Sequence, residues 1–102
     1  MKTFDLNEMT EFPYAEREKN AFYKADQFKA RIIQLPPGGE MPPCEMADHI
    51  LFTVVSGSAD VDVDGEIVTI EVGQMLITPP ATLSMKTRNG VKIAGVQIHK
   101  RS

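Results

Sequence analysis

The sequence predicts an all-β fold, because short extended runs separated by turn residues follow one another from residue 21 almost to the C-terminus. In residues 60–64 valine alternates with aspartate, and Asp64-Gly65 is typical of a tight hairpin turn. Residues 68–72 then alternate in the same way, which predicts a return strand with one solvent-facing side. A second turn signal at Asn89-Gly90 predicts another hairpin. Such a pattern is typical of a β-sandwich or a β-barrel.

The other segments are less regular. Residues 1–20 form an N-terminal arm, in which the stretch after Pro13 is compatible with a short helical turn or with an extended chain. Residues 50–55 are nearly all apolar, so both faces of this strand are expected to be covered. After Gly90 the apolar phase shifts, and a β-bulge at or near Gly95 would explain the shift.

Composition indicates one globular domain, residues 1–102, and excludes several classes of protein. The net charge is −3, and Lys and Arg are scattered among acidic residues, so no nucleic-acid-binding surface is expected. No apolar run reaches the roughly 18 residues that span a membrane, and acidic residues near the start do not fit a signal peptide. A single cysteine, Cys44, cannot form an internal disulfide. We therefore expect a cytoplasmic protein.

Two stretches have the spacing of known motifs. In residues 38–57, Gly38 is followed by Cys44, Met46, Ile50 and Gly57 at the intervals that separate Gly, His, His, Glu and Gly in the first motif of the cupins. Residues 73–84 resemble the second cupin motif, with Ser84 in the place of its histidine. The chain thus resembles the cupin superfamily, which implies a jelly-roll β-barrel, also called a double-stranded β-helix.

The resemblance also implies what has been lost. Cupins typically hold Fe, Mn, Zn, Ni or Cu with three His and one Glu, whose lone pairs bind such metals at about 2.0–2.2 Å. The matching positions here are Cys44, Met46, Ile50 and Ser84. Isoleucine cannot bind a metal and a neutral serine is a poor ligand, so we expect no metal and no other cofactor.

If the family's geometry holds, the barrel interior is lined by Cys44, Met46, Ile50, Phe52 and Ser84. Such a lining suits a small, mostly apolar molecule. Our leading hypothesis is therefore a small-molecule binding or sensing module in which the sequence shows no catalytic arrangement. A barrel filled by its own side chains, with function confined to its surface, is the plainer alternative.

Two metal-binding alternatives stay open. Cys44 and Met46 could hold Cu(I) through a thiolate and a thioether. A displaced site built from Cys44, Glu45 and His49, with or without His99, would instead make a metal-dependent enzyme of isomerase or oxygenase type. It requires Glu45 or His49 to face inward, against the alternation of side chains along a strand.

A homodimer is expected as well. The strand at residues 50–55 carries apolar residues on its outer side, at Leu51 and Val55. The resemblance implies pairing through N-terminal strands and outer sheet faces, which would also protect exposed strand edges.

Overall fold

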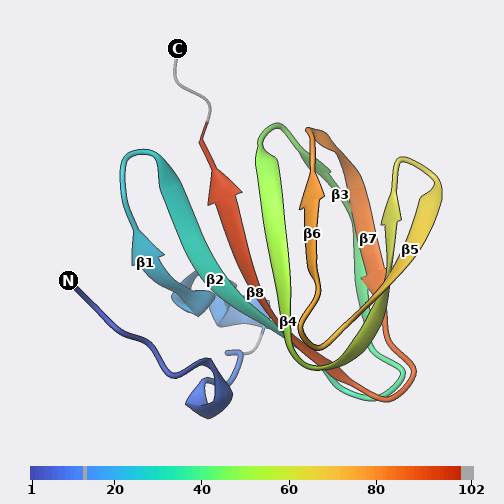
Figure 1. Cartoon of the computed structure of the whole chain (residues 1–102), viewed down its shortest axis with the longest axis horizontal. Coiled ribbons are helices and arrows are strands. Elements are labelled where there is room, and N and C mark those ends of the chain that lie inside the picture. The colour runs from blue at the N-terminus through green and yellow to red at the C-terminus, as the bar shows by residue number, and fades with distance from the viewer. Residues whose placement is uncertain (13, 100–102) are drawn as a thin grey trace.

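The strands form one long antiparallel sheet that folds over on itself (Figure 1). The computed structural model describes residues 1–12 and 14–99, and the all-β prediction is confirmed. The elements are the 3-10 helices η1 (Leu6–Glu8) and η2 (Tyr14–Asn20) and the strands β1 (Ala21–Lys24), β2 (Phe28–Leu35), β3 (Glu40–Met46), β4 (His49–Val63), β5 (Glu66–Glu71), β6 (Met75–Thr78), β7 (Ala81–Lys86) and β8 (Val91–Ile98). Within the described residues, neither helix is long and apolar enough to cross a membrane.

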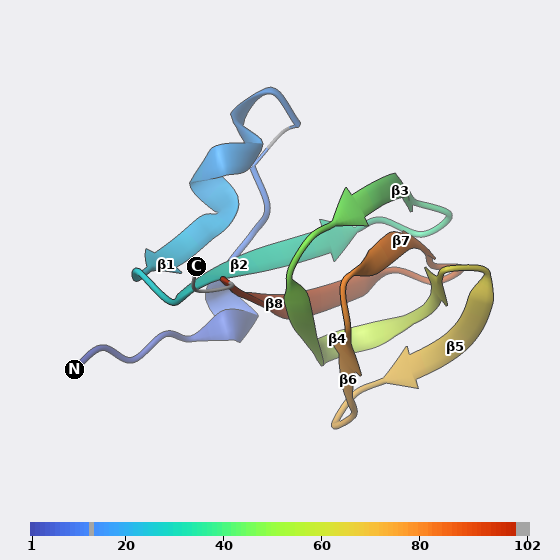
Figure 2. The ribbon, with the colours of Figure 1, turned by 90° about the horizontal axis from the view of Figure 1, so that it is seen from above.

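Strand β4 organises the sheet because it pairs along both edges. On one edge it pairs first with β8 and then with β7, and on the other edge first with β6 and then with β5. Strands β2 and β3 continue the sheet by pairing with β8 and β7, respectively. Strand β4 therefore crosses from one half of the fold to the other. The successive strands β2 and β3, β5 and β6, and β7 and β8 cross in the same way, and the strands surround a common core (Figure 2).

The chain bends at each place where it crosses between the two halves. Short breaks separate β2 from β3, β5 from β6 and β7 from β8, and β4 changes register between Val54 and Ser56. Hydrogen bonds hold adjacent breaks together: Gly38 N donates to Thr87 O at 3.0 Å, and Ser58 N donates to Gly90 O at 3.4 Å. We call these three breaks and the register change in β4 the bend line. Its glycines with positive φ are Gly38, Gly57, Gly73 and Gly90.

The first predicted hairpin is present and the second is not. Asp64 and Gly65 both have positive φ, at 52° and 92°, and join the paired strands β4 and β5. At Asn89-Gly90, by contrast, the chain does not reverse, because β7 and β8 lie one after the other along the same edge of β4. Thr87 Oγ1 accepts from Gly90 N and donates to Ser58 O, which fixes this segment as a bend.

The predicted bulge near Gly95 is also wrong. Pairing between β2 and β8 is continuous through Gly95, whereas the register shift lies in β4 beside Val55. The change of apolar phase in β8 has another cause: Val91 and Ile93 face the core, while Val96 and Ile98 lie on the outer face of the sheet.

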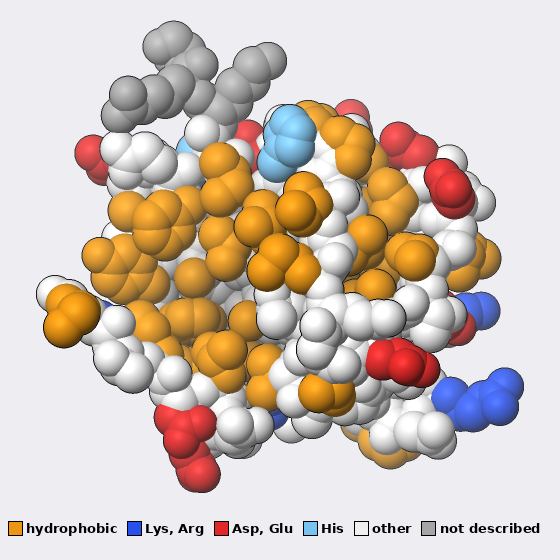
Figure 3. Space-filling view, in the orientation of Figure 1, with side chains coloured by type: hydrophobic (Ala, Val, Ile, Leu, Met, Phe, Trp, Pro, Cys, Tyr) orange, Lys and Arg blue, Asp and Glu red, His pale blue; other side chains and the backbone are white. Residues whose placement is uncertain are grey.

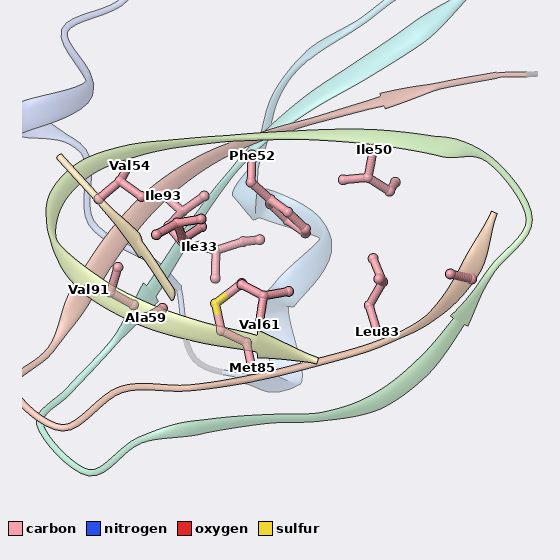
Figure 4. Packing of buried hydrophobic residues seen from close by; sticks show 12 residues of the cluster. Ile33, Ile50, Phe52, Val54, Ala59, Val61, Leu83, Met85, Val91 and Ile93 are labelled. Atoms are coloured by element: carbon pink, nitrogen blue, oxygen red, sulfur yellow. The ribbon is translucent and has the colours of Figure 1, made fainter. Parts of the chain in front are cut away.

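The core fills the space between the two halves of the folded sheet. Twelve buried apolar residues form one cluster (Figure 4), with contributions from the five strands β2, β4, β5, β7 and β8. The N-terminal arm packs outside this cluster: Lys92 Nζ donates to Asn7 O at 2.9 Å, and the ring of Phe4 lies 4.8 Å from that of Phe22, centroid to centroid. The segment for which the sequence left a helical turn open contains η2.

The bend line predicts a strong asymmetry between two glycine substitutions. A Cβ at Gly57 would lie 2.1 Å from Gly90 O, whereas a Cβ at Gly73 would meet no atom within 4 Å. Both residues have positive φ, so each alanine variant is strained by about 1–2 kcal/mol. We expect Gly57→Ala to lower the free energy of unfolding by about 1–3 kcal/mol more than Gly73→Ala, as measured by urea denaturation. Equal losses would contradict the close approach.

Candidate functional site

A small cavity of about 80 Å³ lies between the two halves of the sheet, next to the buried cluster. Its walls come from five strands, so it exists only because the bend line brings β3 and β7 over β2 and β8. Seven lining residues are apolar or glycine and three carry polar or sulfhydryl groups. The lining residues are Ile33, Met41, Met46, Ile50, Phe52, Leu83, Gly95, Arg31, Cys44 and Gln97.

Four of the five residues that the sequence assigned to the interior line this cavity. Ile50 and Phe52 project inward from β4 and are 4% and 3% exposed (Figure 4). Cys44 and Met46 line it from β3, where Cys44 Sγ donates to Met46 Sδ at 3.6 Å. Cys44 is a free thiol and is exposed, so the cavity opens toward solvent on this side.

Ser84 does not belong to the interior, and its assignment there is wrong. Leu83 and Met85 on either side of it point into the core, so alternation along β7 turns Ser84 outward. Cys44 pairs directly with Leu83, which therefore takes the inward position opposite the thiol. Ser84 instead lines a surface hollow together with Asp60, Asp62 and Lys86.

Sequence reasoning missed six of the ten lining residues, and Arg31 is the charged one among them. It shares the inward face of β2 with Ile33. Its Nε is buried, and within the described part of the chain the side chain has no hydrogen-bond or ion-pair partner. Alternation along β2 is only a weak signal for this position, because Ala30 and Ile32 make the opposite face apolar and buried as well, and either face could have been the inner one.

A polar hollow of about 350 Å³ adjoins the cavity through Arg31, which lines both. Lys24 pairs with Lys29 across β1 and β2, so both ammonium groups lie on the same side of the sheet as Arg31. Glu18 is the acidic side chain of this lining. The apolar cavity is therefore next to a cluster of cationic side chains.

The residues of the displaced metal site are not brought together. Glu45 and His49 are exposed, and His49 pairs with Ile98 on the outer side of the sheet. His99 Nδ1 lies 3.5 Å from Asp48 Oδ2, which also accepts a hydrogen bond from Gln97 Nε2 at 2.7 Å. No group of three His, Cys, Asp or Glu side chains with metal-binding spacing occurs among residues 1–12 and 14–99.

A larger hollow of about 630 Å³ lies outside the barrel, between the N-terminal arm and the bend line. Its two charged side chains are already engaged: Glu11 accepts from Gln34 N, and Lys92 donates to Asn7 O. It offers no free charged group to a ligand, so the smaller cavity is the stronger candidate site.

Comparison with solved structures identifies the architecture. An RmlC-like cupin protein from Desulfovibrio desulfuricans superposes with a TM-score of 0.80, at 17% identity over 96% of each chain. The conserved SPY1581 protein of unknown function from Streptococcus pyogenes gives 0.77, at 16% identity over 99% of this chain and 90% of that one. The chain has the cupin fold.

In a third comparison the chain spans less than two thirds of the matched structure's length. The cupin domain of Cnp3 from Schizosaccharomyces pombe superposes with a TM-score of 0.73 at 19% identity, over 78% of this chain and 62% of that one. No protein-family model matches the sequence, and the comparison with curated proteins found no match. At these identities the comparisons establish the fold and leave the function to the residues of the site.

The cavity does not fit the metal centre that the cupin fold implies. Ile50 and Leu83 carry no donor atom, and the nearby sulfur atoms of Cys44 and Met46 suit Cu(I) rather than Fe, Mn or Zn. Arg31 adds a fixed positive charge to the same lining, which opposes the binding of any cation.

We expect the protein to retain far less than one Fe, Mn or Zn ion per chain after incubation with the metal and gel filtration. Mass-spectrometric metal analysis measures this. Stoichiometric retention of any of the three would contradict the expectation.

Copper added under reducing conditions tests the Cys44–Met46 pair, with Cys44→Ser as the control. If the wild type retained one copper ion per chain and this variant retained none, the Cu(I) alternative would be established.

Proposed function

We propose that this protein binds a small molecule with an apolar body inside the barrel, without a transition metal and without a chemical step of its own. The observation that carries the proposal is the cavity of about 80 Å³ where the cupin resemblance implies metal ligands. Its walls are mostly apolar with a few polar groups at fixed places, which is the usual make-up of a small-molecule site.

The cavity limits the size of the ligand. An apolar cavity of about 150 Å³ is large enough to bind benzene, so about 80 Å³ accommodates a smaller body, such as a short branched carbon chain. The rest of the ligand must lie at the mouth, near Cys44 or Arg31. A binding or sensing role for a short metabolite fits these dimensions.

The enzyme hypothesis gains less support. It rests on Glu45 or His49 turning into the barrel, and both are exposed outside it. Ser84 has Asp62 opposite it in the register but no histidine to act as its base among the residues lining that hollow. Neither place contains a nucleophile with a partner that would activate it.

Gly95 allows the cavity to be reduced without disturbing the fold. A Cβ added at this position would lie 3.5 Å from Ile33 Cδ1 and 3.6 Å from Phe52 Cδ1, which are ordinary contact distances. A methyl group is similar in size to a water molecule, about 30 Å³, and would take up more than a third of the cavity's 80 Å³.

We therefore expect the neutral probe 2-methylpropanamide to shift the methyl NMR signals of Ile33, Ile50 and Leu83 in the wild type, with a Kd on the order of millimolar. In Gly95→Ala these shifts should be lost, because the added methyl group occupies the cavity. Stability of the variant should be unchanged or higher by about 0.4–1 kcal/mol. Absence of shifts in the wild type, for this probe and for its anionic analogue 2-methylpropanoate, would favour a self-filled barrel.

We also propose that the outer face of the sheet formed by β1, β2, β8, β4 and β6 pairs with a second copy of the chain. Apolar side chains gather over these strands (Figure 3). Ile77 and Met75 on β6 are 60% and 56% exposed, and Ile98 and Tyr23 extend the same face. A continuous exposed apolar patch of this kind is typical of a protein–protein interface.

Sedimentation velocity tests this pairing. We expect the wild type to sediment as a dimer at micromolar concentration and Ile77→Asp to sediment as a monomer, because the new carboxylate would be buried in the interface. Ile67→Asp is the matched control, since Ile67 is 61% exposed but lies on the other half of the sheet, opposite Asp62. A monomeric wild type would contradict the proposal.

A further inference from the structure

We propose that Arg31 binds the carboxylate of the ligand, so that the cavity recognises short-chain carboxylates with an apolar body. This inference rests on the proposed binding function and specifies its ligand class. It starts from an unusual side chain: a guanidinium in the wall of a cavity whose other lining residues are mostly apolar.

The first step is the lack of a protein partner for Arg31. Its Nε is buried, and no hydrogen bond or ion pair joins the side chain to another described residue. Buried polar groups in folded proteins nearly always have partners, because an unpaired one loses its hydration without compensation. A ligand that accepts hydrogen bonds at the cavity wall would supply the missing partner.

The second step is the arrangement of the cavity around this guanidinium. Ile33 lies two residues farther along the same face of β2, and Phe52 and Leu83 form the opposing apolar walls. A ligand with its carbon chain among these side chains would have its polar end at Arg31. The planar fork of a guanidinium matches a carboxylate, which accepts two parallel N–H···O bonds.

The third step is the charge in the hollow that adjoins the cavity. Lys24 and Lys29 line the hollow that Arg31 shares with the cavity, against one acidic side chain, Glu18, in the same lining. No carboxylate lines the cavity itself, and Asp48, which Gln97 contacts, already accepts from Gln97 and lies beside His99. The net field favours an anion over a neutral molecule or a cation.

The experiment compares 2-methylpropanoate with its neutral isostere 2-methylpropanamide, by NMR titration of the full chain. In the wild type we expect the anion to bind at least tenfold more tightly. In Arg31→Gln this preference should disappear while the amide still binds. Arg88→Gln is the matched control, because it removes the same charge from an exposed loop residue that lines neither hollow, and the preference should remain.

The outcomes separate the two proposals. If the amide and the anion bind equally to the wild type, carboxylate recognition by Arg31 is wrong while the binding cavity stands. If neither binds, the binding function fails as a whole. Competition by inorganic phosphate as strong as that of the carboxylate would also overturn the proposed ligand class. A structural role for Arg31 would lower the melting temperature of ligand-free Arg31→Gln, whereas relief of an unpaired buried group leaves it unchanged or raises it.

Discussion

The close approach of Gly57 to Gly90 is the constraint on which the rest of the structure depends. With no side chain at Gly57, β4 passes within van der Waals distance of the bend between β7 and β8, and Ser58 N reaches Gly90 O. This contact lets one strand belong to both halves of the sheet. Without it, β3 and β7 would not lie over β2 and β8, and neither the core nor the cavity would be enclosed.

The same geometry determines which side chains enter the cavity. Pairing across β3 and β7 places Cys44 opposite Leu83, so these two residues face the interior and Ser84 cannot. A match in motif spacing counts residues along the chain, whereas the direction of a side chain depends on alternation within the paired strand. A shift of one residue in the register of β7 is enough to move a motif position from the interior to the surface.

Sequence reasoning predicted the elements that depend on local chemistry and missed those that depend on pairing partners. Asp64-Gly65 specifies its hairpin by backbone conformation alone. Asn89-Gly90 has the same local signal, but its flanking strands pair with β4 rather than with each other. Arg31 escaped notice because Ala30 and Ile32 made the other face of β2 an equally good candidate for the interior.

The apolar side chains of the cavity lining and the position of Arg31 have a common electrostatic consequence. A bound metal ion presents positive charge to a substrate and also polarises its bonds or activates water. A guanidinium presents positive charge and hydrogen-bond donors but has no vacant coordination position and stays protonated. Ile50 and Leu83 provide no donor atoms and Arg31 provides a fixed cation, so the role we propose for the interior is to hold an anion in place rather than to transform it. This difference is why we propose a binding protein rather than an enzyme.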